Sequence, residues 1–137
     1  MLAQSAAPGT ADAVVALVTL RAELAEFLKR EVDAWEIPAE HVSLFGSAAR
    51  GHGSTESDLD ILVISSNETD EQDWEDQLTV SADRIRSATG NHVAWFSIGE
   101  DDLGRAVAAD ESVVESWLRD GVHVAGVRLR TILRKVS

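Results

Sequence analysis

The chain contains no cysteine, no tyrosine and only two prolines among its 137 residues. Without cysteine, disulfide bonds and thiolate metal sites are impossible, so a metal ion would have to be held by oxygen or imidazole ligands. Without tyrosine, the chain cannot modify itself on a phenolic hydroxyl. The scarcity of proline, together with a hydrophobic content of 45%, is typical of a globular α/β protein with one domain.

Long apolar runs are also missing, and no stretch approaches the roughly 20 apolar residues that a membrane-spanning helix needs. The N-terminus carries no basic residue ahead of an apolar segment, which argues against a secretory signal peptide. We therefore expect a cytoplasmic protein without membrane contact. Residues 1–10 are predicted to form a disordered leader and residues 11–137 a single domain.

Basic residues are absent between Arg50 and Arg84, where ten acidic residues occur, and the net charge of the chain is −12. Such a field repels phosphate backbones, and nucleic-acid affinity rests largely on Lys and Arg. We therefore expect no stable binding to nucleic acid. A basic protein partner is a better electrostatic match, although an acidic surface can also serve solubility alone.

The hydrophobic periodicity predicts an α/β (α+β) fold with a small mixed β-sheet and helices packed on one side of it. Helices are predicted over 12–35, 70–89, 101–109 and 112–120, with a helical tail over 127–136. Strands are predicted over 41–45, 58–65, 92–98 and 122–124. The near-continuous apolar run over 61–64 predicts a strand that is buried on both faces.

The most informative segment covers residues 42–64. A short apolar strand leads into Gly46 and Ser47, and ten residues later Asp58 and Asp60 open a second apolar strand. Alternate residues of a strand point to the same side, so the two acids would project together, about 7 Å apart along the strand. Two such carboxylates can chelate a hard cation such as Mg²⁺. Gly46 would let a ligand approach the backbone and Ser47 would contact phosphate, which together indicate metal-assisted phosphoryl or nucleotidyl transfer.

These residues resemble the motif of the nucleotidyltransferase superfamily that includes DNA polymerase β, and within it the minimal nucleotidyltransferases that act as antitoxins. The pattern there is Gly-Ser, often continuing to Ala-Arg-Gly, and then Ser-Asp-x-Asp before an apolar strand. It is met here at Gly46, Ser47, Ala49, Arg50, Gly51, Ser57, Asp58 and Asp60. The resemblance is specific over residues 42–64, becomes vague beyond Gly90, and implies the nucleotidyltransferase fold.

The resemblance implies an enzyme that transfers an NMP, most simply AMP, from ATP or another NTP to a hydroxyl of a partner toxin. The usual toxin in that family is of the HEPN ribonuclease type. Asp58 and Asp60 would be the catalytic residues and the ligands of Mg²⁺. The nucleotide would be bound by Gly46, Ser47, Arg50 and Ser57. Arg50 could equally pair with a nearby acid such as Glu56, and Ser57 could instead orient the turn at Asp58.

One family feature is missing from the sequence. Active members often carry a third carboxylate on the strand after the second helix, but residues 92–98 contain no acid, and Ala94 stands at about the expected position. Glu100 and Asp101 follow that strand and could reach inward from a loop. Two alternatives stay open. The missing carboxylate and the acidic face favour an antitoxin that neutralises its toxin by contact alone. An acidic face would also attract the cationic substrates of a small-molecule nucleotidyltransferase resembling the aminoglycoside-modifying enzymes.

Overall fold

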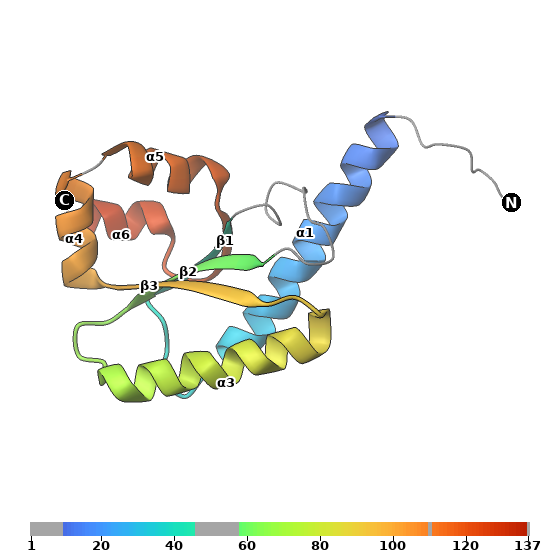
Figure 1. Ribbon diagram of the computed structural model, residues 1–137. Coiled ribbons are helices and arrows are strands. Elements are labelled where there is room, and N and C mark those ends of the chain that lie inside the picture. The colour runs from blue at the N-terminus through green and yellow to red at the C-terminus, as the bar shows by residue number, and fades with distance from the viewer. Residues whose placement is uncertain (1–9, 46–57, 110, 137) are drawn as a thin grey trace, which may run out of the picture.

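The structure is a computed structural model that describes residues 10–45, 58–109 and 111–136. Within these ranges the elements are helix α1 (Thr10–Asp33), strands β1 (His41–Phe45) and β2 (Leu59–Ser65), helix α3 (Glu71–Thr89), strand β3 (Val93–Gly99), helices α4 (Glu100–Ala109) and α5 (Glu111–Asp120), strand β4 (Val122–Gly126) and helix α6 (Leu129–Val136) (Figure 1). All the helices and strands expected from the sequence are present, with ends that agree to within two residues. The predicted leader over 1–10 lies almost wholly outside the described residues.

The strands form one mixed sheet in the order β3-β2-β1-β4. Strand β1 is antiparallel to both β2 and β4, whereas β2 and β3 run parallel. Parallel neighbours need a crossover connection, and α3 provides it. This arrangement confirms the small mixed sheet expected from the sequence.

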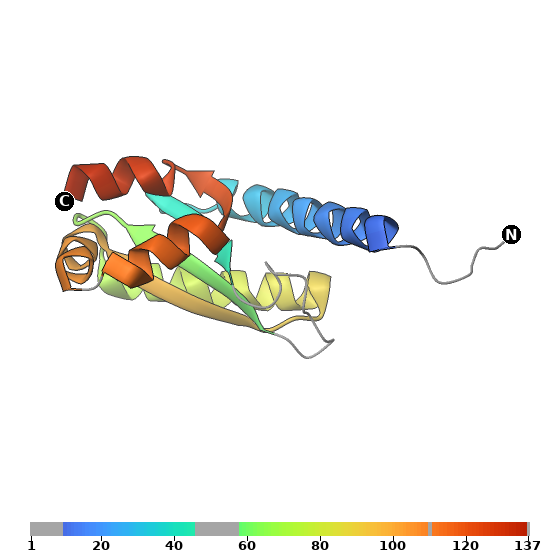
Figure 2. The same cartoon turned by 90° about the horizontal axis from the view of Figure 1, so that it is seen from above.

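Helices cover both faces of the sheet, so the expectation that they lie on one side is wrong. Helices α1 and α3 pack on one face, around Val42, Leu44 and Ile61. Helices α4, α5 and α6 pack on the other face, around Leu62 and Ile64. Figure 1 shows α3 across the sheet from α5 and α6, and Figure 2 gives the same arrangement from above. The physical reason is the apolar run of β2: residues 61–64 are at most 1% exposed, and burial on both faces requires two layers of helices.

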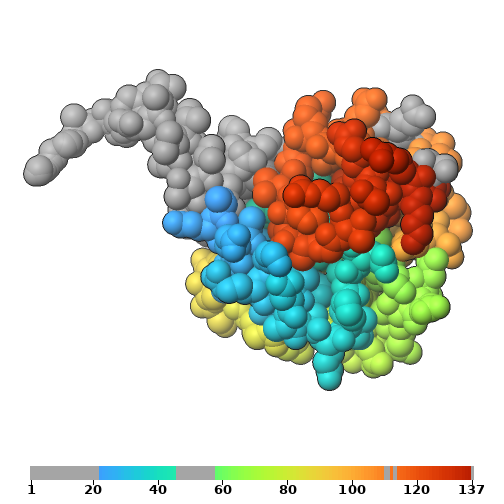
Figure 3. All heavy atoms as spheres, turned by 180° about the vertical axis from the view of Figure 1, so that it is seen from behind, coloured from blue at the N-terminus to red at the C-terminus, as the bar shows by residue number. Residues whose placement is uncertain are grey.

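Helix α1 extends beyond the sheet that it covers. Leu28 and Val32, in its C-terminal half, pack in the same core as Val124 and Ala125 of β4. The N-terminal half projects past the edge of the sheet (Figures 1 and 2). Figure 3 shows α1 beside the C-terminal segment on the back of the molecule. None of the helices in the described ranges combines the length and the apolar character needed to cross a membrane.

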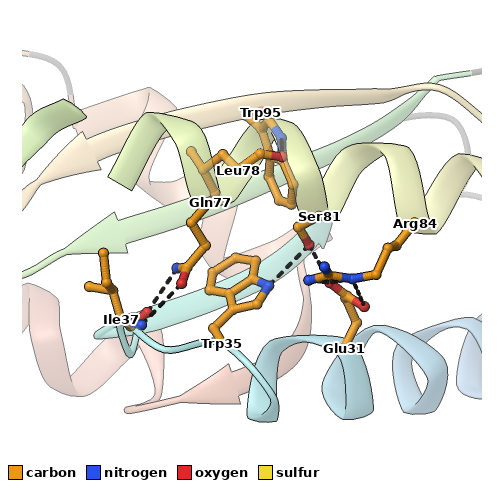
Figure 4. A network of polar contacts seen from close by, with 8 residues as sticks. All are labelled: Glu31, Trp35, Ile37, Gln77, Leu78, Ser81, Arg84 and Trp95. Atoms are coloured by element: carbon orange, nitrogen blue, oxygen red, sulfur yellow. Dashed lines mark hydrogen bonds and ion pairs between the residues drawn. The ribbon is translucent and has the colours of Figure 1, made fainter. Parts of the chain in front are cut away.

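A polar network joins the end of α1 to α3 (Figure 4). The indole Nε1–H of Trp35 donates to Ser81 Oγ at 3.0 Å, and the Ser81 hydroxyl donates to Glu31 Oε2 at 2.7 Å. Arg84 binds the same carboxylate, with Nη2 2.7 Å from Oε2. Burial by itself raises the pKa of Glu31, but the hydrogen bonds from Arg84 and Ser81 and the charge of Arg84 outweigh it, so the pKa lies below its usual value. The network therefore keeps Glu31 ionised and fixes α3 against α1.

Candidate functional site

Asp60 lies on a central strand of the sheet, near the N-terminal end of that strand. It is the second residue of β2 and pairs with Phe45 of β1 on one side and with Ala94 of β3 on the other. Asp58 directly precedes the strand, which begins at Leu59, one residue later than the sequence predicted. Both acids are exposed, whereas Leu59 between them is 2% exposed, as the alternation along a strand requires.

The two halves of the sequence motif start from the same end of the sheet. Because β1 and β2 are antiparallel, the last residue of β1 lies beside the beginning of β2. The chain therefore leaves the sheet at Phe45 and returns to it at Asp58 at one end. The residues predicted to bind nucleotide lie outside the described residues, and their role stays a prediction: Gly46, Ser47, Arg50 and Ser57.

A cavity of about 370 Å³ adjoins Asp60 on the face of the sheet that α5 covers. This volume falls in the range of about 300–1,000 Å³ that is usual for small-molecule sites. Two larger hollows, of about 570 and 710 Å³, lie against α3, and neither Asp58 nor Asp60 lines them. The smaller cavity is therefore the one next to the predicted chemistry. Its wall includes Phe45, Asp60, Ala94, Phe96, Ser116, Trp117 and Asp120.

The end of α5 reaches this cavity because the chain passes very close to β1. A Cβ atom on Gly121 would lie 2.5 Å from Cε1 of Phe45 and 2.8 Å from the carbonyl oxygen of Trp117. Such distances are too short for any side chain, so the close approach requires glycine. It places Trp117 and Asp120 at the wall of the cavity.

Asp120 is a residue that reasoning from the sequence missed. Its Oδ2 accepts a hydrogen bond from the Ser116 hydroxyl at 3.4 Å, and its Oδ1 accepts one from Arg119 Nε at 3.3 Å. It is the last residue of α5, where the helix dipole disfavours a negative charge. A residue that is unfavourable for its own helix often has a functional role. The acid at the C-terminal end of the predicted helix was therefore the signal in the sequence that could have identified Asp120.

The structure shows which residue of β3 lies beside Asp60. Ala94 is the direct neighbour of Asp60 in the parallel register, so β3 offers no acid beside it, as the sequence indicated. The expectation that Glu100 and Asp101 could reach inward is wrong. They open α4 beyond the opposite end of β3, about 20 Å along the strand from Ala94, and Glu100 accepts a hydrogen bond from Lys135 at 3.4 Å.

The acids on β2 fit a divalent cation that is shared with a phosphate ligand. In the described ranges no three acidic or histidine side chains are grouped closely enough to hold a metal ion. Asp58 and Asp60 nevertheless offer carboxylate oxygens, and Mg²⁺ in nucleotide sites is commonly held by one or two carboxylates together with substrate phosphates and water. The donor set therefore suits a cation that arrives with a nucleotide.

Comparison with protein families identifies the class of this fold. Residues 21–116, which include β1, β2, α3 and β3, match the nucleotidyltransferase domain family. The match spans well over half of the chain, and the chain belongs to this family. No curated protein matches the sequence significantly.

Among solved structures, this chain is similar to proteins of toxin–antitoxin pairs. The toxin–antitoxin MntA–HepT matches with 17% identity and a TM-score of 0.50, over 84% of this chain and 82% of that chain. The complex of an MNT antitoxin with the tri-AMPylated HEPN toxin of Shewanella oneidensis matches with 17% identity and a TM-score of 0.49, over 85% and 82%. A toxin–antitoxin with AMP-PNP matches with 20% identity and a TM-score of 0.47, over 72% and 71%. The likeness to MntA–HepT agrees with the nucleotidyltransferase fold that the motif implied.

Proposed function

We propose that this chain is a Mg²⁺-dependent nucleotidyltransferase that transfers an NMP, most simply AMP from ATP, to a hydroxyl of a partner toxin. The placement of Asp60 carries the proposal. The acid lies at the beginning of a central strand, beside a cavity of ligand size and at the end of the sheet from which the Gly-Ser segment departs. Membership of the nucleotidyltransferase domain family supports nucleotidyl transfer as the class of reaction.

The residues of the motif would have different roles in the reaction. Asp58 and Asp60 would hold Mg²⁺, which when bound offsets the negative charge that develops on the α-phosphate and on the leaving pyrophosphate. The triphosphate would lie against Gly46 and Ser47, with Arg50 and Ser57 as further contacts. The hydroxyl oxygen of the acceptor forms a bond to the α-phosphorus, the bond from that phosphorus to the bridging oxygen breaks, pyrophosphate leaves, and the hydroxyl proton passes to water.

The proposed partner follows from the fold and the charge of this chain. The MntA–HepT pair, whose fold is similar, is a toxin–antitoxin complex, and a HEPN-type toxin is the partner that the sequence motif implies. The net charge of −12 favours a partner with a basic surface.

Nucleotide binding tests the assignment of the two acids. Asp58→Ala and Asp60→Ala should each weaken the binding of ATP with Mg²⁺, measured by calorimetry, by at least about 10-fold, because each removes a charged ligand. Neither change should destabilise the fold, since both acids are exposed and lie close to each other. Asp83→Ala, an exposed acid on α3, is the matched control and should bind normally. Unchanged binding in both site variants would show that the motif is only a structural relic.

Ala94 favours a second candidate function, neutralisation of the toxin by contact alone. With alanine beside Asp60, β3 offers no carboxylate to accept the proton of the hydroxyl. An enzyme should silence the toxin in substoichiometric amounts when ATP and Mg²⁺ are present. A binding module should need equal amounts of protein, should tolerate the Asp58→Ala/Asp60→Ala double variant, and should weaken as salt screens the acidic surface.

A further inference from the structure

An exposed aromatic ring lies on the sheet beside the predicted metal ligands. Of the Phe and Trp side chains that the structure describes, Phe96 on β3 is the one that is mostly exposed, at 54%. It lies on the face of the sheet that α5 covers, where the neighbouring strand contributes the buried Leu62. Trp117 of α5 meets this ring in an edge-to-face arrangement, with a centroid distance of 5.6 Å and an interplanar angle of 61°.

The position of this ring relative to Asp60 is set by the register of two strands. Asp60 pairs with Ala94, and Leu62 pairs with Phe96, so the ring is one step along the sheet from the acid on the same face. Neighbouring strands lie about 4.8 Å apart and each residue advances about 3.3 Å along a parallel strand, so such diagonal neighbours are about 8 Å apart. In a nucleoside triphosphate a ribose separates the α-phosphate from the base. A nucleotide with its α-phosphate near Asp60 can therefore place its base over this part of the sheet.

The side chains of the cavity wall suit a nucleobase better than a phosphate group. Asp60 and Asp120 both line the cavity. Asp60 would share Mg²⁺ with the phosphates, whereas the carboxylate of Asp120 repels phosphate oxygens. The rest of the wall consists of four aromatic residues, Phe45, Trp95, Phe96 and Trp117, together with Ile61, Leu62, Ala94 and Ser116. Aromatic side chains stack on the flat, uncharged face of a nucleobase, and any of the bases has such a face.

We propose that the cavity between β3 and α5 is the subsite for the nucleobase of the nucleotide substrate, with Phe96 and Trp117 as its stacking surface. This inference rests on the proposed nucleotidyltransferase function, and it adds two specificity-determining residues to that function. Ser116 and Asp120 line the same cavity. Trp117 lies one residue beyond the segment that matches the family.

The test compares two probes, ATP and inorganic tripolyphosphate, each with Mg²⁺, by calorimetry on the full chain. Phe96→Ala should weaken ATP binding by about 5- to 150-fold, which corresponds to the usual contribution of one base–aromatic stack. It should leave tripolyphosphate binding unchanged, because that probe has no base. Phe96→Tyr should retain ATP binding. Val80→Ala truncates an apolar side chain of similar exposure, 51%, on α3, and should change neither affinity.

Fluorescence supplies a second readout that does not depend on the stability of a truncated variant. ATP with Mg²⁺ should quench the emission of Trp117, whereas tripolyphosphate should not. Trp117→Phe keeps a ring for stacking, so it should bind ATP but lose that part of the quenching.

The outcomes distinguish this subsite from the function on which it rests. If Phe96→Ala binds ATP as the wild type does, or if the wild type binds ATP no better than tripolyphosphate, the base subsite is wrong and the nucleotidyltransferase proposal stands. The same holds if Phe96→Ala binds ATP normally but fails to modify the toxin, since the cavity would then receive the acceptor side chain. If the wild type binds neither probe, the proposed function fails and the subsite fails with it.

Discussion

Removal of one buried hydroxyl should cost this fold a large part of its stability. Ser81 is 0% exposed and is the central member of the network between α1 and α3. Ser81→Ala leaves the indole N–H of Trp35 without its acceptor in a buried position, which costs about 1–3 kcal/mol. Glu31 loses one hydrogen bond but keeps Arg84, a further cost of about 1 kcal/mol, whereas alanine regains about 0.5 kcal/mol of helix propensity. We expect a net loss of about 1.5–3.5 kcal/mol in the free energy of unfolding.

Urea denaturation followed by circular dichroism measures this loss. Ser87→Ala, an exposed serine on the same helix, is the matched control and should change the free energy of unfolding by no more than about 0.5 kcal/mol. A double-mutant cycle with Trp35→Phe isolates the indole hydrogen bond, because Ser81→Ala should cost clearly less when no indole N–H is present. Additive effects of the two substitutions, or a Ser81→Ala loss equal to that of Ser87→Ala, would refute the reasoning.

Two further changes act on other parts of the sheet. Burial lowers the pKa of His41 to about 4, although its hydrogen bond to the backbone of Val127 acts in the opposite direction. Below about pH 6.5 the imidazole is therefore protonated in the unfolded chain but stays neutral in the folded chain, so the free energy of unfolding falls as the pH falls. The loss from this residue should reach about 2 kcal/mol by about pH 5 and disappear in His41→Gln, as measured by urea denaturation at each pH. Gly121→Ala should lower the free energy of unfolding by about 1–3 kcal/mol, because the new Cβ atom forces Phe45 aside. Gly99→Ala is the control: its Cβ atom would meet nothing nearer than 3.8 Å, so it should have little effect on thermal unfolding.

The sequence predicted the elements of the fold because their signals are local. The spacing of apolar residues is enough to define α3, and the run Val42–Phe45 followed by the Gly-Ser pair is enough to define β1 and its end. The error about the layers was avoidable: an apolar run over residues 61–64 already required cover on both faces of the sheet. Asp58 and Asp60 were singled out for a similar reason, since a pair of carboxylates at the start of a buried strand conflicts with burial, and their role stays a prediction.

The parts of the site contributed by α5 could not be predicted from the sequence. Trp117 and Asp120 reach the cavity only through the close contact of Gly121 with Phe45, which joins segments about 75 residues apart. Phe96 stands in a strand whose alternation predicts its side of the sheet, but its exposure depends on where α5 lies. Tertiary packing, rather than local preference, decides both features.

The intact mass of the toxin tests the central claim most directly. A helical protein encoded next to this chain would be co-expressed with the wild type and, separately, with the Asp58→Ala/Asp60→Ala double variant, then purified and weighed by mass spectrometry. The account predicts that the toxin gains the mass of one or more AMP groups with the wild type and none with the double variant. A toxin of unmodified mass that both forms neutralise equally at equal concentration would contradict it.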